Sequence, residues 1–202
     1  MKKFLKKIFG PSKREIWEQL SKEINAQYVD HGLFTVPKVI AKHRDWEICL
    51  DTYTTDDTTY TRLSSPYVSK HGFQFRIYRH GLFSNVGKLL GMQDIEVGYD
   101  AFDDDFIIQG NDPYKVELMF DNESIRELLQ DIPKVDLRIQ DGSAWFEKRQ
   151  VIKPVDNLHF QVMGTIKDIE QLKVLFELFA EMLDQLCEIG AAYDEKPTNK
   201  YP

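Results

Sequence analysis

The sequence predicts an α+β protein with one or more antiparallel sheets, an N-terminal helix, a short middle helix and a long C-terminal helix. Apolar residues recur every three or four positions near both ends of the chain, a spacing typical of helices that bury one face. Between these ends, short runs alternate apolar and polar residues, as half-buried strands do. Helices and strands do not alternate one by one, so the pattern does not indicate a Rossmann arrangement.

The composition indicates a folded protein and gives no sign of a nucleic-acid partner or a cofactor. Of the 202 residues, 42% are hydrophobic and 29% are charged, which is enough apolar material for one sizeable core. The net charge of −7 provides no general attraction to phosphate backbones. The few cysteines and the lack of an export signal favour a cytoplasmic location.

Changes in composition divide the chain into three parts. Residues 1–11 form a basic amphipathic segment, residues 12–192 a single α+β domain, and residues 193–202 a polar, flexible tail. The domain is either one unit or two closely packed halves that meet near residues 81–91. That stretch contains Gly-Lys but lacks the glycine spacing of a phosphate-binding loop.

The first ten residues, MKKFLKKIFG, have the pattern of a short helix that lies on a membrane surface. They contain four lysines and no acid, so the rest of the chain carries −7 − 4 = −11. On a helix the lysines and the apolar residues fall on opposite faces, which suits peripheral contact with an anionic inner membrane face. The alternative is a basic terminus that docks on the acidic body of the same chain. The residues expected to meet the membrane are Lys2, Lys3, Phe4, Lys6, Lys7, Ile8 and Phe9.

The first half of the domain is expected to start with a helix at about residues 12–27. Ser12 and Glu15 form the Ser-x-x-Glu capping box that opens such a helix. After this helix the sequence pattern is typical of strands, although Pro37 weakens the first strand candidate. The strand candidates of this half are residues 33–41, 45–53, 60–63 and 73–78.

The second half combines short helices and strands and ends with the longest helix. Asp112 is expected to cap a helix whose first residue is Pro113, although residues 115–120 also fit a strand. The remaining predicted elements are strands at 106–109, 135–140, 144–152 and 158–165, a hairpin turn at Asp141-Gly142, a helix at 124–130, and a C-terminal helix between Asp168 and Gly190.

The acidic stretch around YDAFDDDFIIQGND is the candidate metal site. Between Lys88 and Lys115 there is no Lys or Arg, and hard cations prefer clustered carboxylate oxygens. The spacing does not match an EF-hand, and consecutive aspartates on a strand would point to opposite faces. The alternative is a solvated turn before a strand, with Phe102 and Phe106 buried. The candidate ligands are Asp100, Asp103, Asp105 and Asp112, within an acidic region at 94–112 that a metal-dependent enzyme would use.

The same stretch carries a resemblance to known proteins. Phe102-Asp103, Phe106-Ile107-Ile108 and Asp112, followed by a helix, form an FD…F-apolar-apolar…D pattern. This pattern resembles one found in a loose group of bacterial proteins of unknown function, over the second half of the chain. The resemblance implies a bacterial origin and a shared fold, and it implies no activity. Within it, Asp103 belongs to a turn and Asp112 to a helix cap.

The basic and aromatic run HGFQFRIY echoes an RNA-binding strand motif, but the match fails at two positions. Gln74 stands where that motif needs a small residue, and Arg76 stands where it needs an apolar one. The run therefore indicates an ordinary strand, whose Arg76 and Arg79 are expected to pair with the acidic stretch. RNA is not an expected partner.

The cysteines and histidines do not form a recognisable catalytic or metal-binding motif. Cys49 falls on the polar side of its strand and is the candidate reactive thiol. A catalytic thiol needs a nearby base, and His43 is the histidine closest to it in sequence. We predict no catalytic residue from the sequence.

These observations favour a non-enzymatic binding or protein-interaction module. The C-terminal helix carries more large apolar residues than one buried face needs, with Val174, Leu178 and Met182 widening its apolar stripe. Such a helix is either wrapped by a sheet or used in a homodimer, and a separate protein partner is the other expected contact. The alternatives are a membrane adaptor anchored by MKKFLKKIFG and a metal-dependent enzyme.

Overall fold

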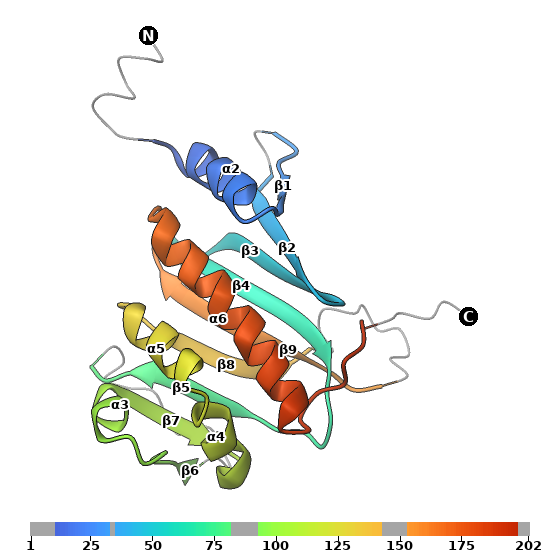
Figure 1. Ribbon diagram of the computed structural model, residues 1–202. Helices are drawn as coiled ribbons and strands as arrows, with labels where there is room; N and C mark the ends of the chain where they lie inside the picture. Colours follow the sequence, from blue (N-terminus) through green and yellow to red (C-terminus); the bar gives the residue numbers. More distant parts are fainter. Residues whose placement is uncertain (1–10, 33–34, 82–92, 143–152, 198–202) are drawn as a thin grey trace.

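A single antiparallel sheet runs through both halves of the chain in the computed structural model, which describes residues 11–32, 35–81, 93–142 and 153–197 (Figure 1). Its nine described strands lie in the order β1-β2-β3-β4-β9-β8-β5-β7-β6. The C-terminal strand β9 lies between β4 and β8 and so joins the two halves. The strands are β1 Gln27–Val29, β2 Lys38–His43, β3 Trp46–Thr55, β4 Thr58–Val68, β5 Phe75–Arg79, β6 Gln93–Asp94, β7 Phe106–Gly110, β8 Asp136–Asp141 and β9 Val155–Met163.

Helices cover one face of this sheet, and the longest one crosses its middle (Figure 1). The order of elements confirms the predicted α+β class. The helices are α2 Lys13–Glu23, α3 Asp100–Asp105, α4 Pro113–Phe120, α5 Glu123–Asp131 and α6 Ile169–Glu188.

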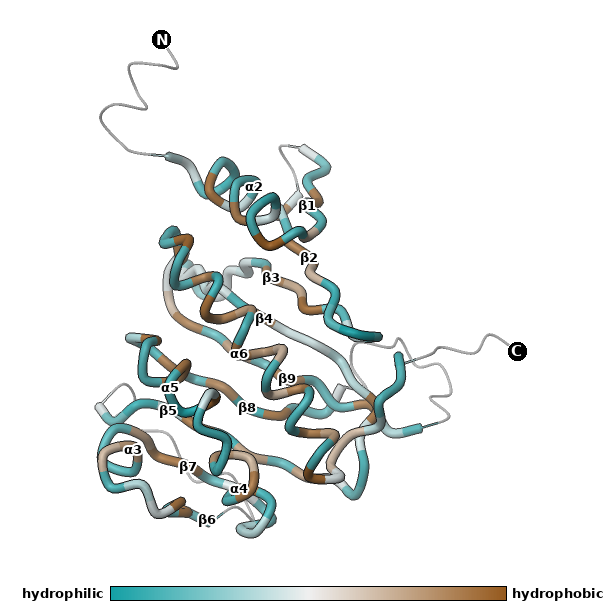
Figure 2. The backbone as a smooth tube through the Cα atoms, viewed as in Figure 1, coloured by the Kyte–Doolittle hydropathy of each residue, from teal (hydrophilic) through white to brown (hydrophobic). Residues whose placement is uncertain are grey.

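The core lies between the sheet and α6. One row of apolar side chains crosses six strands in register and faces the helices, because side chains alternate between the two faces of a strand. The members of this row are Leu50, Leu63, Phe160, Leu137, Ile77 and Ile108, and all are buried. In Figure 2, brown segments recur along α6 and along β8 behind it, as this layer requires.

The wide apolar stripe of α6 is buried within the same chain. Leu178 and Met182 are completely buried, and Val174 packs against the core. The helix contacts α2 and α5 on its flanks as well as the sheet beneath it. Among the described residues, no large exposed apolar side chain belongs to α6. The observation that suggested a homodimer through this helix is therefore explained by packing inside one chain.

The predicted helix caps are confirmed. Ser12 accepts a hydrogen bond from the backbone of Glu15, whose side chain bonds back to Ser12, so the capping box is complete. Asp112 caps α4 with Pro113 in its first turn, and residues 115–120 are helical. The first helix ends at Glu23 and not near residue 27, because Asn25 adopts a positive φ of 52° that no right-handed helix contains.

Some predicted elements differ from the structure or lie outside its described part. The first long strand begins at Lys38, after Pro37, because proline lacks the N–H that a central strand would use. A short helix, α3, replaces the expected turn in the acidic stretch, and Phe102 is buried as expected. Residues 1–10, the expected strand at 144–152 and the region 82–92 lie outside the described residues. Strand β8, expected to form a hairpin with 144–152, pairs with β5 and β9.

Candidate functional site

The sheet face turned away from α6 carries polar side chains, many of them buried. We call it the polar face. Strand β9 illustrates the alternation: Leu158 and Phe160 enter the core, while the residues on either side of them point the other way. The polar face includes Asp51, Arg62, Ser64, Arg76, Asp136, Arg138, Asn157, His159 and Gln161.

Two ion pairs cross neighbouring strands of the polar face. Arg62 donates to both carboxylate oxygens of Asp51, at 2.8 and 2.7 Å, in the bidentate geometry that arginine favours. Arg76 donates its Nε to Asp136 at 2.8 Å, with both side chains almost completely buried. Arg138 lies 3.6 Å from the other oxygen of Asp136. The Asp136 carboxylate is therefore surrounded by positive charge.

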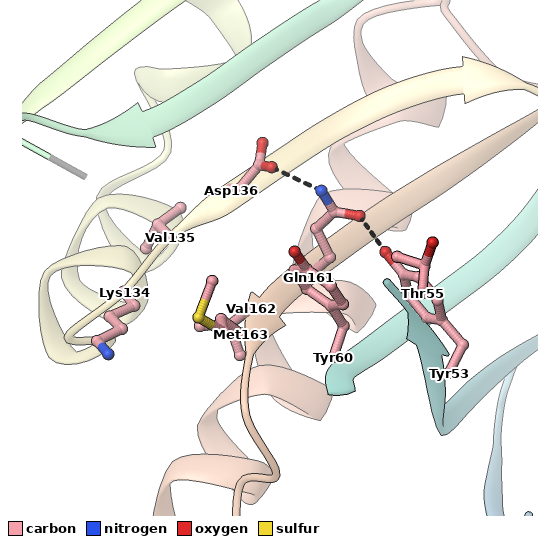
Figure 3. Close-up of a pocket in the computed structure, with 9 residues that line it drawn as sticks. All are labelled: Tyr53, Thr55, Tyr60, Lys134, Val135, Asp136, Gln161, Val162 and Met163. Atoms are coloured by element: carbon pink, nitrogen blue, oxygen red, sulfur yellow. Dashed lines mark hydrogen bonds between the residues drawn. The ribbon is translucent and has the colours of Figure 1, made fainter. Parts of the chain in front are cut away.

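A hydrogen-bonded chain runs from Asp136 to Tyr53 (Figure 3). The amide Nε2 of Gln161 donates to Asp136 Oδ2 at 3.1 Å, and the Tyr53 hydroxyl donates to Gln161 Oε1 at 2.8 Å. An ionised carboxylate accepts and does not donate, so the amide nitrogen of Gln161 must face Asp136. This contact fixes the orientation of the amide.

A pocket of about 370 Å³ opens beside this chain, where strands β8 and β9 separate (Figure 3). Their pairing ends at Leu137 and Phe160, while β9 continues along β4 and β8 continues along β5. The volume lies in the range of small-molecule or side-chain sites. We call it the Tyr60 pocket, and its lining residues are Tyr53, Thr55, Tyr60, Lys134, Val135, Asp136, Gln161, Val162 and Met163.

The imidazole of His159, next to Gln161 of the pocket wall, is held in one protonation state. Burial lowers the pKa of His159 to about 4, so its imidazole is neutral at neutral pH. Its Nε2 lies 3.3 Å from Gln161 Oε1, which is an acceptor, so Nε2 carries the proton. Asp136 already accepts from Arg76 and Gln161. This arrangement can hold a ligand, but its carboxylate and imidazole are poorly placed to exchange protons with one.

The four candidate metal ligands do not converge: three contact different parts of the chain and the fourth is exposed. Asp103 accepts three backbone N–H groups, from Val97, Gly98 and Tyr99, at 2.9 to 3.1 Å. The other three are placed as follows: Asp105 pairs with Arg79 at 3.0 Å, Asp112 caps α4, and Asp100 lies exposed in the first turn of α3. In the described ranges no three His, Cys, Asp or Glu side chains gather closely enough to hold a metal ion.

The two arginines of β5 have separate partners. Arg79 pairs with the acidic stretch through Asp105, as expected, and also donates to backbone carbonyls at the end of α5. Arg76 pairs with Asp136 and not with the acidic stretch. The two side chains point to opposite faces of the strand, which is why they cannot share one acidic segment.

Cys49 and His43 do not form a catalytic pair. Cys49 is half-buried, and desolvation raises the pKa of its thiol to about 11. His43 lies on the other face of the sheet, where its Nε2 contacts Asp184 of α6 at 2.9 Å. A raised pKa leaves little thiolate at neutral pH.

The membrane-contact residues predicted at the N-terminus all fall in residues 1–10, outside the described residues. Over the ranges that are described, no helix has the length and apolar character needed to cross a membrane.

Sequence reasoning did not find the Tyr60 pocket. A signal was present: β8 and β9 carry a polar residue at every second position, at Asp136 and Arg138 and at Asn157, His159 and Gln161. Such alternation also describes an ordinary solvated strand face. Only the pairing of β9 with both β4 and β8 brings Tyr60, Gln161 and Asp136 to one place.

Comparison with known proteins finds similarity in fold only. No family model matches the chain, and no curated protein matches it. The predicted resemblance to bacterial proteins of unknown function therefore stays a prediction. A similar solved structure is that of the mycobacterial trehalose monomycolate transport factor A, TtfA, with a TM-score of 0.52 and 8% sequence identity. The match covers 93% of this chain and 98% of that one, and at this identity it shows the fold alone.

Proposed function

We propose that this protein is a non-enzymatic binding module whose Tyr60 pocket holds an apolar side chain of a partner polypeptide together with an adjoining backbone carbonyl. The observation that carries the proposal is a pocket of side-chain size whose polar wall is already fixed by an internal hydrogen-bonded chain. A fixed wall loses little conformational freedom when a ligand arrives, so more of the contact energy appears as affinity.

The apolar part of the pocket fits a hydrophobic side chain. Tyr53 and Tyr60 stack with ring centroids 5.2 Å apart, which holds the Tyr60 ring in place. Met163 also lines the pocket, and 65% of its surface is exposed, so its side chain is accessible to a ligand. Methionine adapts its shape to different ligands, and tyrosine gives large contact area at low entropic cost.

The polar part of the pocket fits a hydrogen-bond acceptor. The Gln161 amide has two N–H donors, and Asp136 is the acceptor that the described residues supply for them. One donor therefore stays available at the pocket wall. Because Arg76 balances the charge of Asp136, a neutral acceptor such as a peptide carbonyl suits this wall.

The test uses blocked amino acids as probes of the pocket. Saturation-transfer NMR on the full chain would compare N-acetylphenylalaninamide and N-acetylleucinamide with N-acetylglycinamide, which lacks the apolar side chain. We expect transfer to the first two at millimolar concentration and none to the third. The Tyr60→Ala variant should lose this transfer, whereas Tyr114→Ala, which removes an exposed tyrosine of α4, should keep it.

Two results would contradict the proposal. One is the absence of transfer to any apolar probe in the wild-type chain. The other is equal transfer in wild type and Tyr60→Ala, once thermal unfolding has shown that both variants are folded.

A peripheral membrane adaptor is the second candidate function, and the charge asymmetry of the N-terminus favours it. The four lysines of MKKFLKKIFG contrast with a remainder of −11, from −7 − 4. Flotation with anionic liposomes would compare the full chain with one that starts at Ser12. Loss of flotation in the shorter chain supports the anchor, and equal flotation of both dismisses it.

A further inference from the structure

We propose that Ser64, Asn157 and His159 form a second binding site on the polar face, and that this site holds a neutral hydroxyl group. The site is separate from the Tyr60 pocket, which none of these three residues lines. It does not depend on the function proposed above.

The three side chains are brought together by strand register. Ser64 of β4 and His159 of β9 are direct cross-strand partners. Asn157 precedes His159 by two residues on the same strand and so points to the same face. Direct neighbours of this kind have Cβ atoms about 5 Å apart and diagonal neighbours lie about 7 to 8 Å apart, so a single bound group between them can bridge all three side chains.

These side chains contain buried polar atoms that make no hydrogen bond. The atoms are Ser64 Oγ, both amide atoms of Asn157, and His159 Nδ1, and none has a partner in the described part of the chain. The residues are 1%, 0% and 5% exposed, respectively. Buried polar groups in folded proteins are nearly always paired, and a group without a partner calls for an explanation. Three such side chains at adjoining positions indicate one shared partner.

The Gln161 contact determines what His159 offers to this site. Because Gln161 Oε1 accepts from Nε2, and because burial keeps the imidazole neutral, Nδ1 carries a lone pair and no proton. His159 is therefore an acceptor at Nδ1. Asn157 adds an N–H donor and a carbonyl acceptor, and Ser64 adds a hydroxyl.

This set of groups complements a hydroxyl. A bound O–H donates to His159 Nδ1, and its oxygen accepts from the Asn157 amide and the Ser64 hydroxyl. An ion fits less well, because the three side chains are themselves uncharged and together offer both donors and acceptors. The hydroxyl belongs either to an ordered water molecule or to a neutral polyhydroxy compound, and both present the same chemistry.

The test reads the His159 nitrogens directly. The full chain is labelled with ¹⁵N-histidine, and long-range ¹H–¹⁵N spectra are recorded in buffer, with glycerol and with glucose. Loss of a signal in His159→Gln assigns the resonance. We expect a neutral ring protonated at Nε2, with the Nδ1 resonance moved upfield as in an imidazole nitrogen that accepts a hydrogen bond.

The variants Asn157→Leu and Ser64→Ala supply the control. Each should move the Nδ1 resonance downfield, toward the position of an unbonded nitrogen, and the milder Ser64→Ala guards against an Asn157→Leu chain that does not fold. An upfield resonance in buffer that the polyols leave unchanged identifies water as the hydroxyl. A change that saturates with glycerol or glucose identifies the polyhydroxy compound. An unbonded Nδ1 position under all three conditions, unchanged in both variants, would overturn the proposal.

Discussion

Gln161 donates its amide nitrogen to the Asp136 carboxylate at 3.1 Å, at the point where the strands that carry them stop pairing. A side-chain hydrogen bond thus spans the gap where the strand ladder ends. It connects the wall of the Tyr60 pocket to the buried Arg76–Asp136 ion pair. The stability of the polar face and the shape of the pocket therefore depend on the same carboxylate.

Asp136→Asn is expected to destabilise the protein strongly. The side chains of Arg76 and Asp136 are only 9% and 2% exposed, and removing one charge of a buried ion pair typically costs about 3 to 5 kcal/mol. Urea denaturation of both chains measures the difference in the free energy of unfolding. Asp104→Asn, at an exposed position of α3, is the control and should stay within about 0.5 kcal/mol of wild type. Equal losses in the two variants would show that the ion pair is not structurally important.

The elements that were predictable from sequence are those whose signals are local. The capping box of Ser12 and Glu15 and the cap at Asp112 act within one helical turn, so a few residues determine them. Each of these features was readable without knowledge of the rest of the fold.

The candidate site was not predictable because its contacts are distant in sequence. Arg76 and Asp136 are separated by 60 residues, and Tyr53 and Gln161 by 108. Alternation assigns such residues to a strand face but does not say which strands adjoin. The insertion of β9 between β4 and β8 decides that, and no local pattern encodes it.

Because of His159, we expect the free energy of unfolding to decrease as the pH falls from about 6.5 to about 4. The pKa of His159 is about 4 in the folded protein, compared with 6.5 for a solvated imidazole, so the unfolded chain binds the proton first on acidification. A pKa shift of this size corresponds to about 3 kcal/mol of folding stability. This stability is fully present above pH 6.5 and is lost as the pH falls to about 4. Unfolding by urea at a series of pH values measures this slope.

The variant His159→Gln isolates this contribution from other titrating groups. The charged groups around His159 are Arg138, Arg62 and Asp136, and they remain in the variant. Asp156, whose pKa is raised by burial, works in the opposite direction, because it favours the folded state on acidification. We expect the variant to lose less stability than wild type between pH 7 and pH 4. Parallel curves for the two chains would contradict the assignment.

Asp103→Ala is expected to loosen the segment before α3 without affecting metal binding. Its carboxylate accepts from Val97, Gly98 and Tyr99, and loss of a charged acceptor that serves three donors should cost about 2 to 3 kcal/mol. Asp104→Ala is the matched control.

Millimolar Ca²⁺, Mg²⁺ or Mn²⁺ should leave the melting temperature of wild type unchanged. A metal ion that bound the folded state would raise this temperature. A selective rise that Asp103→Asn abolishes would instead establish the acidic stretch as a metal site.

Cys49 is expected to react slowly with alkylating agents in the folded protein. With a pKa of about 11, only about one thiol in a thousand is ionised at pH 8, compared with about one in four for an ordinary cysteine of pKa 8.5. His43 does not help to ionise the Cys49 thiol, because it lies on the opposite face of the sheet and contacts Asp184. Mass spectrometry of a Cys187→Ser chain treated with iodoacetamide would follow Cys49 alone. Its rate should rise at least about 100-fold when urea unfolds the chain. A folded-state rate within tenfold of the unfolded one would mean that the thiol is ionised and accessible, and it would restore Cys49 as a candidate nucleophile.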